Sequence, residues 1–203
     1  MKKTNWLYLL TLIAVIACNT SSQKVTKPQL TKPKPAVNTE TDNTDTLITA
    51  GDTAHILMRQ VYSHAFSDPS KKDTFKLYLT GTALIGGKVL FAVVAHSGKL
   101  IYIEKFNAYD LIGDLDDTDP TPNQREDTIR ARFNDFFNRK SFETPALDIS
   151  QPIDSDLADI GIQKDIRSDK TSIGFTYAYG YEGVQEIAWS KRRKKVVICM
   201  AAD

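Results

Sequence analysis

Residues 75–106 read FKLYLTGTALIGGKVLFAVVAHSGKLIYIEKF and carry the clearest β-pattern of the chain. In Phe75–Leu79 apolar residues alternate with a lysine, which is typical of a strand with one buried face. Residues 88–96 are apolar on both faces, as expected of a strand at the centre of a sheet or beneath a helix. Ser97-Gly98 then separates this strand from another at Leu100–Phe106, which is a hairpin pattern. The stretch therefore predicts three antiparallel strands.

Further along the chain, residues 122–139 have the pattern of an amphipathic helix. Thr121 can act as the N-cap, Pro122 stands at the first helical position, and Gln124 follows three residues after the cap. One apolar face is formed by residues at helical spacing, namely Ile129, Phe133, Phe136 and Phe137. We expect this helix to cover one face of a sheet.

The remaining segments complete the expected fold. Strands are predicted at 172–179, 184–189 and 195–200, a short helix at 53–66, and a loop with one short helical turn at 144–170. We therefore expect a single globular α+β domain over residues 53–203, with an antiparallel sheet of about six strands and the 122–139 helix packed on it. A β-sandwich or half-open barrel is the alternative.

Residues 18–52 have the composition of a linker. They are rich in Thr, Pro and Lys, and almost no large apolar residue occurs before Leu47. Such a segment cannot bury enough apolar surface to offset the entropy of ordering it, so we predict disorder. The formal net charge of the whole chain is +1. Because a nearly neutral chain has no long-range field to attract a polyanion, nucleic-acid binding is not expected.

The first seventeen residues have the layout of a secretory signal peptide. Lys2 and Lys3 precede an apolar run from Trp6 to Ala17, which is too short to span a bilayer. The run ends in Val15-Ile16-Ala17-Cys18, which resembles the lipobox of bacterial lipoproteins. The resemblance implies that residues 1–17 are removed and that Cys18 carries diacylglycerol and a further acyl chain such as palmitate. Cys18 would then anchor the protein in a membrane of the cell envelope. The outer membrane of a Gram-negative bacterium is the expected location, on its periplasmic or its surface face.

A further resemblance is carried by three stretches of the domain: Phe75-Lys76-Leu77 to Phe106, Arg132-Phe133 to Phe137 with Pro145-Ala146, and Ile187-Ala188-Trp189-Ser190-Lys191 with its basic turn. Together they resemble small, uncharacterised Bacteroidetes-type bacterial lipoproteins. The resemblance supports the lipid anchor and the domain layout, and it implies no activity.

The sequence contains two cysteines. Since Cys18 would carry lipid, Cys199 has no partner for an intrachain disulfide. Cys199 lies in the apolar run from Val196 to Met200, which indicates a small core residue and not a nucleophile.

No catalytic motif, metal site or cofactor site is assigned from the sequence. Gly81–Lys88 departs from a P-loop because Gly87 occupies the position of the phosphate-binding lysine. The acidic cluster between Asp110 and Asp119 departs from an EF-hand loop, and a solvated loop before a helix N-terminus explains it without metal. The three histidines lack a close metal-ligand spacing.

The basic run at 191–195 is the first candidate for ligand contact. It contains Arg192, Arg193 and Lys194 at the tip of a predicted hairpin. A solvated turn is the first interpretation, and contact with an anionic surface is the alternative.

An alternating set of aromatic residues is the second candidate. Because strand side chains alternate between faces, four rings fall on one face: Phe175, Tyr177, Tyr179 and Tyr181. The opposite face carries only small residues, so the aromatic face is expected to face the core. An exposed ladder, with Tyr179 and Tyr181 in contact with ligand, is the alternative.

These features predict a non-enzymatic, lipid-anchored envelope module that binds a protein or a glycan. The alternative is an envelope carbohydrate-active enzyme that works through carboxylates which no motif identifies. A pair of buried carboxylates with shifted pKa values in a cleft would favour the enzyme, whereas a flat apolar patch would favour binding.

Overall fold

The computed structural model describes residues 55–150, 153, 156, 158–178, 180 and 183–202. The predicted signal peptide at 1–17 and the predicted linker at 18–52 lie outside this range, as does the start of the domain at 53. Among the described residues, no helix has the length and apolar character needed to cross a bilayer.

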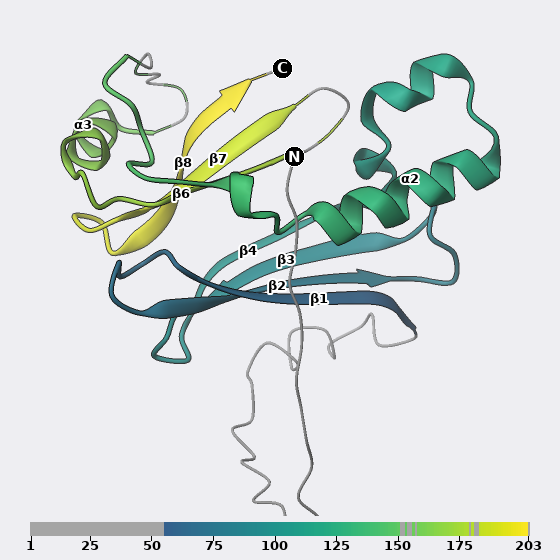
Figure 1. Ribbon diagram of the computed structural model, residues 1–203, viewed down its shortest axis with the longest axis horizontal. Helices are drawn as coiled ribbons and strands as arrows, with labels where there is room; N and C mark the ends of the chain where they lie inside the picture. The colour runs from purple at the N-terminus through teal and green to yellow at the C-terminus, as the bar shows by residue number, and fades with distance from the viewer. Residues whose placement is uncertain are drawn as a thin grey trace, which may run out of the picture. The chain divides into compact units, whose positions relative to one another are not determined.

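The described chain folds into two antiparallel sheets of four strands each. Sheet A has the order β1-β2-β3-β4, with β1 at Ile56–Ala65, β2 at Lys72–Thr80, β3 at Lys88–Val94 and β4 at Leu100–Asn107. Sheet B has the order β5-β6-β7-β8, with β5 at Phe142–Glu143, β6 at Gly174–Ala178, β7 at Val184–Ser190 and β8 at Lys195–Ala202. The predicted α+β fold, with one sheet of about six strands and one main helix, is therefore wrong. Strands dominate, and they are divided between two sheets (Figure 1).

Part of this error comes from β1, which was predicted as a short helix. Its inward-facing side chains include Gln60 and His64, so the alternation of apolar and polar residues is hidden in the sequence. The structure explains both polar residues. Gln60 Nε2 donates to the carbonyl oxygen of Asn134 at 2.7 Å, and the His64 ring stacks on Phe142 with centroids 4.0 Å apart.

The three strands predicted within residues 75–106 are confirmed as β2, β3 and β4. Strands β3 and β4 form the expected hairpin around Ser97-Gly98, with the amide of Gly98 donating to the carbonyl oxygen of Ala95 at 2.8 Å. Strand β3 lies inside sheet A, and every residue from Val89 to Val94 is buried. This is the environment that its continuous apolar run predicted.

In the part of the chain that the structure describes, two α-helices and three short 3₁₀ helices connect the strands: η1 at Ala108–Leu111, η2 at Gly113–Thr118, α2 at Pro122–Asp135, η3 at Arg139–Ser141 and α3 at Ile160–Ser168. The predicted N-terminus of α2 is confirmed, because Thr121 Oγ1 accepts from the amide of Gln124 and Gln124 Oε1 accepts from the amide of Thr121. The helix ends at Asp135, earlier than predicted. Helix α3 is longer than the single turn expected between 144 and 170.

Sheet B and α2 lie on the same face of sheet A, as Figure 1 shows. The shared core between them is built largely from aromatic rings. Phe75 and Phe91 of sheet A contact Phe175 of sheet B at ring-centroid distances of 5.3 and 5.5 Å, and Phe91 also contacts Phe136 beyond the end of α2 at 5.4 Å. Burying a large apolar side chain contributes about 1.5–3 kcal/mol, so this cluster is a main source of stability.

A smaller cluster lies on the other face of sheet B, beneath α3. It joins Ile162 and Ile166 of the helix to Ala188, Val197 and Cys199 of β7 and β8. The sequence prediction that Cys199 is a core residue is confirmed: its thiol is free and buried, and burial raises its pKa. Phe175 and Tyr177 are buried as well, as their alternation predicted.

Candidate functional site

The predicted basic hairpin tip is the turn at residues 191–194 between β7 and β8. Ser190 holds the turn closed, because its Oγ accepts from the amide of Arg193 at 3.1 Å and its carbonyl oxygen accepts from the amide of Lys194 at 2.7 Å. Lys194 adopts a positive φ of 52°, a conformation that costs a residue with a Cβ about 1–2 kcal/mol. The position of these cations is therefore set by the backbone.

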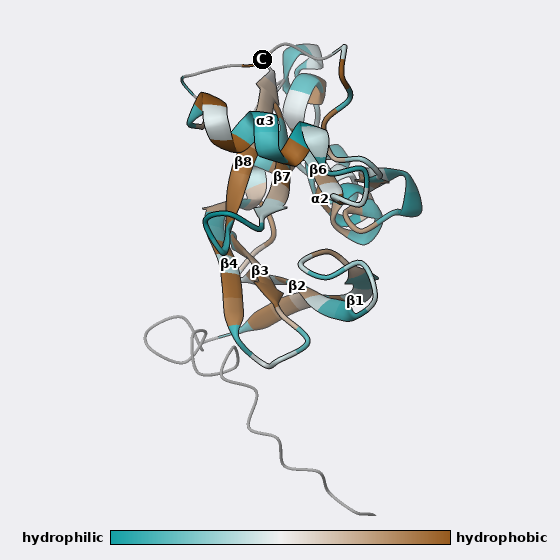
Figure 2. Cartoon of the chain, turned by 90° about the vertical axis from the view of Figure 1, so that its left-hand side faces the viewer, coloured by the Kyte–Doolittle hydropathy of each residue, from teal (hydrophilic) through white to brown (hydrophobic). Residues whose placement is uncertain are grey.

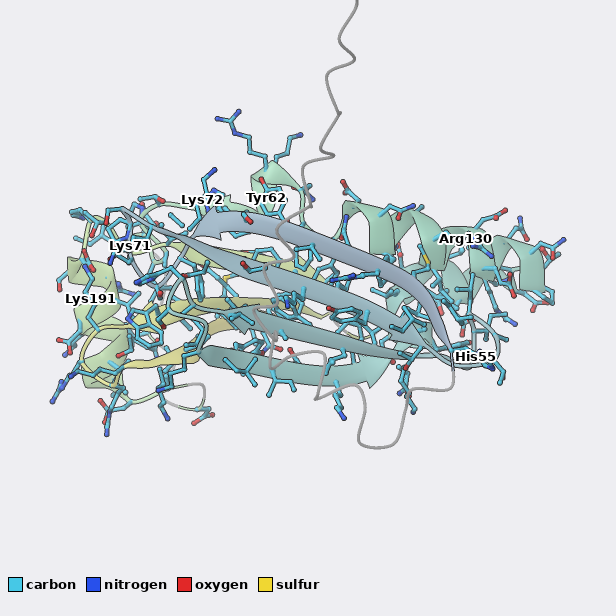
Figure 3. All side chains as sticks on the ribbon, turned by 90° about the horizontal axis from the view of Figure 1, so that it is seen from below. His55, Tyr62, Lys71, Lys72, Arg130 and Lys191 are labelled. Carbon is cyan, nitrogen blue, oxygen red and sulfur yellow. The ribbon has the colours of Figure 1, made fainter. Side chains whose placement is uncertain are left out.

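Two cations of the tip are directed towards α3 and its end. Lys191 Nζ lies 2.6 Å from an oxygen of Asp169, and Arg192 Nη1 lies 3.2 Å from an oxygen of Asp165. Figure 3 places Lys191 beside this helix. Because these side chains are largely exposed, each pair contributes at most about 1 kcal/mol. Lys191 and Arg192 thus have a local structural role.

Two further cations of the basic run, Arg193 and Lys195, border a groove of about 460 Å³. We call this the β8 groove; it is lined by Tyr102, Ala158, Asp159, Ile162, Arg193 and Lys195–Ile198. Arg193 and Lys195 are exposed, and within the described part of the chain neither forms an ion pair. Asp159 brings a negative charge, but its carboxylate caps α3 by accepting from the amide of Ile162 at 3.2 Å.

Strand β8 presents a sheet edge to this groove. It pairs with β7 on one side, and in the described ranges no strand pairs with its other side. The four consecutive lining residues Lys195–Ile198 include side chains of both faces, which is the pattern expected where a groove follows a strand edge. Figure 2 looks onto this side, with α3 above β8 and β4 below it.

Tyr102, which lines the β8 groove, belongs to a hydrogen-bonded group that links the two sheets. Tyr102 of β4 donates to Glu104 Oε2 at 2.8 Å, Tyr177 of β6 donates to the same oxygen, and the two hydroxyls lie 2.9 Å apart. Burial, together with Tyr102 and Glu104, raises the pKa of Tyr177, which therefore donates as a neutral phenol.

A second groove, of about 600 Å³, lies against the face of sheet B that carries Glu186. We call it the carboxylate groove; it is lined by Asp135, Asn138, Arg139, Lys140, Ser141, Glu143, Thr176, Glu186 and Met200. Asn138 fixes the shape of one wall, because its side-chain oxygen accepts from the amides of Lys140 and Ser141 at 2.8 and 3.1 Å. Its side-chain amide donates to the carbonyl oxygen of Asp135 at 3.1 Å.

Glu186 is the unusual residue of the carboxylate groove. Its side chain is buried, with 1% of the residue exposed, and its Oε1 has no hydrogen-bond partner in the part of the chain that the structure describes. Burial raises its pKa to about 8, and the negative charge of Glu143 adds to the shift. A Cβ at Gly174 would overlap Glu186 Oε1, so this glycine provides the space for the carboxyl group.

The pair of buried carboxylates with shifted pKa values that would favour an enzyme is absent in the described residues. One carboxyl group, that of Glu186, is buried with a shifted pKa, while its neighbour Glu143 is exposed. The β8 groove is lined largely by apolar side chains with cations at its border, whereas the carboxylate groove is lined largely by polar and charged residues. The acidic cluster is engaged by arginines, with Asp114 bound by Arg132 at 2.8 Å and Asp116 by Arg125 at 3.1 Å.

Of the candidate residues named from the sequence, the structure places Arg193 at the β8 groove and leaves Arg192 and Lys194 on the turn. Cys18, Tyr179 and Tyr181 lie outside the described residues. Sequence reasoning missed Glu186. The one signal in the sequence was that Glu186 is an acidic residue inside the strand predicted at 184–189. A glutamate in such a strand is rarely fully buried without a partner.

The chain matches no family model, no curated protein and no solved structure. Its function therefore has to be inferred from the chemistry of the two grooves.

Proposed function

We propose that this protein is a lipid-anchored lipoprotein of the cell envelope that binds the extended segment of a partner protein along the edge of β8, without catalysing a reaction. The observation that carries the proposal is the edge of β8 inside the β8 groove, with which no strand of the described chain pairs. A peptide that adds to a sheet edge gains main-chain hydrogen bonds, and the flanking side chains select its sequence.

Charge defines the kind of partner. Arg193 and Lys195 border the groove without ion pairs in the described chain, and Lys194 lies between them on the turn. Among the described residues that line the groove, Asp159 is the one acid, and it is engaged at the helix terminus. The surroundings of the β8 edge thus favour a partner segment that carries acidic residues, whose charge also speeds the encounter.

The anchor part of the proposal rests on the lipobox at Val15–Cys18. Two or more acyl chains give stable membrane attachment, whereas one gives marginal binding. We expect Cys18→Ser to release the protein from the membrane fraction of the cell. A variant that still sediments with membranes after a salt wash would contradict the lipid anchor.

Site-specific photo-crosslinking in the native envelope tests the β8 groove. A photoreactive residue at Val196 is expected to capture a partner, and the combined change Arg193→Glu and Lys195→Glu is expected to abolish the capture because it reverses the charge of the groove. Arg130→Glu is the matched control, since Arg130 and Lys191 lie at opposite ends of the molecule (Figure 3). Equal loss of capture in this control would refute binding at the β8 edge.

A further inference from the structure

We propose that the carboxylate groove is a second binding site, which takes an uncharged carbohydrate and in which Glu186 donates a hydrogen bond to a sugar oxygen. This site is separate from the β8 groove, so either proposal can fail without the other.

The strand register determines where the Glu186 carboxyl group lies. Glu186 of β7 is paired with Thr176 of β6 and Met200 of β8, and Glu143 of β5 is paired with Gly174 of β6. Because directly paired residues point to the same side of a sheet, these positions share the face that lines the groove. Gly174 is the one member without a side chain, and the Glu186 carboxyl group fills the space that it leaves.

Glu186 Oε1 has no hydrogen-bond partner among the described residues, so the carboxyl group lacks a hydrogen bond that a ligand could supply. A buried polar group without a hydrogen bond costs about 1–3 kcal/mol, so a hydrogen bond from the Glu186 carboxyl group, which lines the groove, to a ligand oxygen would offset part of this cost. Burial and then Glu143 raise the pKa of Glu186 to about 8, so the group carries a proton at neutral pH and can donate. Among the described residues, the charged or titratable groups that line the groove or interact with Glu186 come from four elements: Glu143 of β5, Asp135 of α2, Arg139 and Lys140 of η3, and Cys199 of β8.

The balance of these groups points to a neutral, hydroxyl-rich ligand. The carboxylates of Asp135 and Glu143 offset the cations Arg139 and Lys140, so the groove favours neither an anion nor a cation. A sugar carries several hydroxyls that both donate and accept. The carboxylates can accept from them, Glu186 and the cations can donate to them, and the hydroxyls of Ser141 and Thr176 can do either. The volume of about 600 Å³ falls in the range of small-ligand sites.

Binding of the full-length protein to an array of neutral oligosaccharides, including malto-, cello- and chito-oligosaccharides, tests this proposal. We expect at least one neutral oligosaccharide to bind, and its affinity to fall as the pH rises through about 8, where Glu186 loses its proton. Glu186→Gln keeps a donor and is expected to bind without this pH dependence. Glu186→Leu removes the donor and is expected to bind about tenfold more weakly. Arg193→Glu changes only the β8 groove and is expected to leave glycan binding intact.

Three results would overturn the proposal. The first is a folded protein that binds no neutral oligosaccharide on the array. The second is a wild-type affinity whose pH dependence is the same as that of Glu186→Gln, a comparison that holds even if Glu186→Leu fails to fold. The third is hydrolysis of the bound oligosaccharide that disappears in Glu186→Gln, because the groove would then be an active site and not a binding site.

Discussion

Replacing Glu186 by glutamine should change how stability depends on pH. The folded protein raises the pKa of this carboxyl group from 4.5 to about 8 by burial and by the charge of Glu143. Between these two values the folded state holds a proton that the unfolded state has released. The free energy of unfolding therefore falls as the pH rises from about 4.5 to about 8, by about 1.4 kcal/mol per pH unit. Glutamine resembles the protonated acid and does not titrate, so the variant lacks this contribution.

The size of the effect follows from the two pKa values. Relative to Glu186→Gln, the wild-type protein should lose roughly 3–4 kcal/mol of stability between pH 5 and pH 8. Urea unfolding at several pH values, followed by the fluorescence of Trp189 in β7, measures this difference. Contributions of other titrating groups cancel, since both proteins share them. Glu126→Gln, which changes a partly exposed glutamate on α2, is the matched control and should parallel the wild type. If Glu186→Gln also parallels the wild type, Glu186 is not a neutral buried acid.

Further substitutions test the packing of sheet B and the basic turn. Gly174→Ala places a Cβ onto Glu186 Oε1 and should destabilise the protein, and part of the loss should return when Glu186→Ala is added; equal losses in both backgrounds would refute the contact. Phe175→Ala should cost about 3–5 kcal/mol in urea unfolding because the ring is fully buried between the sheets, and a loss below about 1 kcal/mol would contradict its place in the core. Lys194→Gly should raise the free energy of unfolding by about 0.5 kcal/mol. Glycine removes the cost of the positive φ, and this gain exceeds the stabilisation of the unfolded chain by the extra freedom of glycine. A clear loss of stability would show that the Lys194 side chain contributes to the fold.

Local patterns in the sequence predicted local structure well. The apolar run of β3 and the capping residues Thr121 and Gln124 specify their elements through short-range physics, and both are confirmed. The strand β1 was missed because Gln60 and His64 point inward, where Gln60 Nε2 donates to Asn134 and the His64 ring stacks on Phe142. Those partners lie far along the chain, so no local pattern contains them.

The division into two sheets could not be read from the sequence for a similar reason. Strand β5 is only two residues long, Phe142 and Glu143, yet it completes the edge of sheet B and brings Glu143 towards Glu186. The candidate site depends on the same long-range register. Gly174 and Glu186 become neighbours only when β6 pairs with β7, and neither residue belongs to a recognisable motif.

Hydrogen exchange of the backbone amides of β8 tests the proposed function most directly. The exchange rates of Lys195–Cys199 would be compared between the purified protein and the protein crosslinked to its partner through Val196. Strand addition predicts that amides directed away from β7 become protected when the partner is bound, because they then donate to the added strand. Unchanged exchange along β8, with protection elsewhere on the molecule, would contradict binding of a partner at this edge.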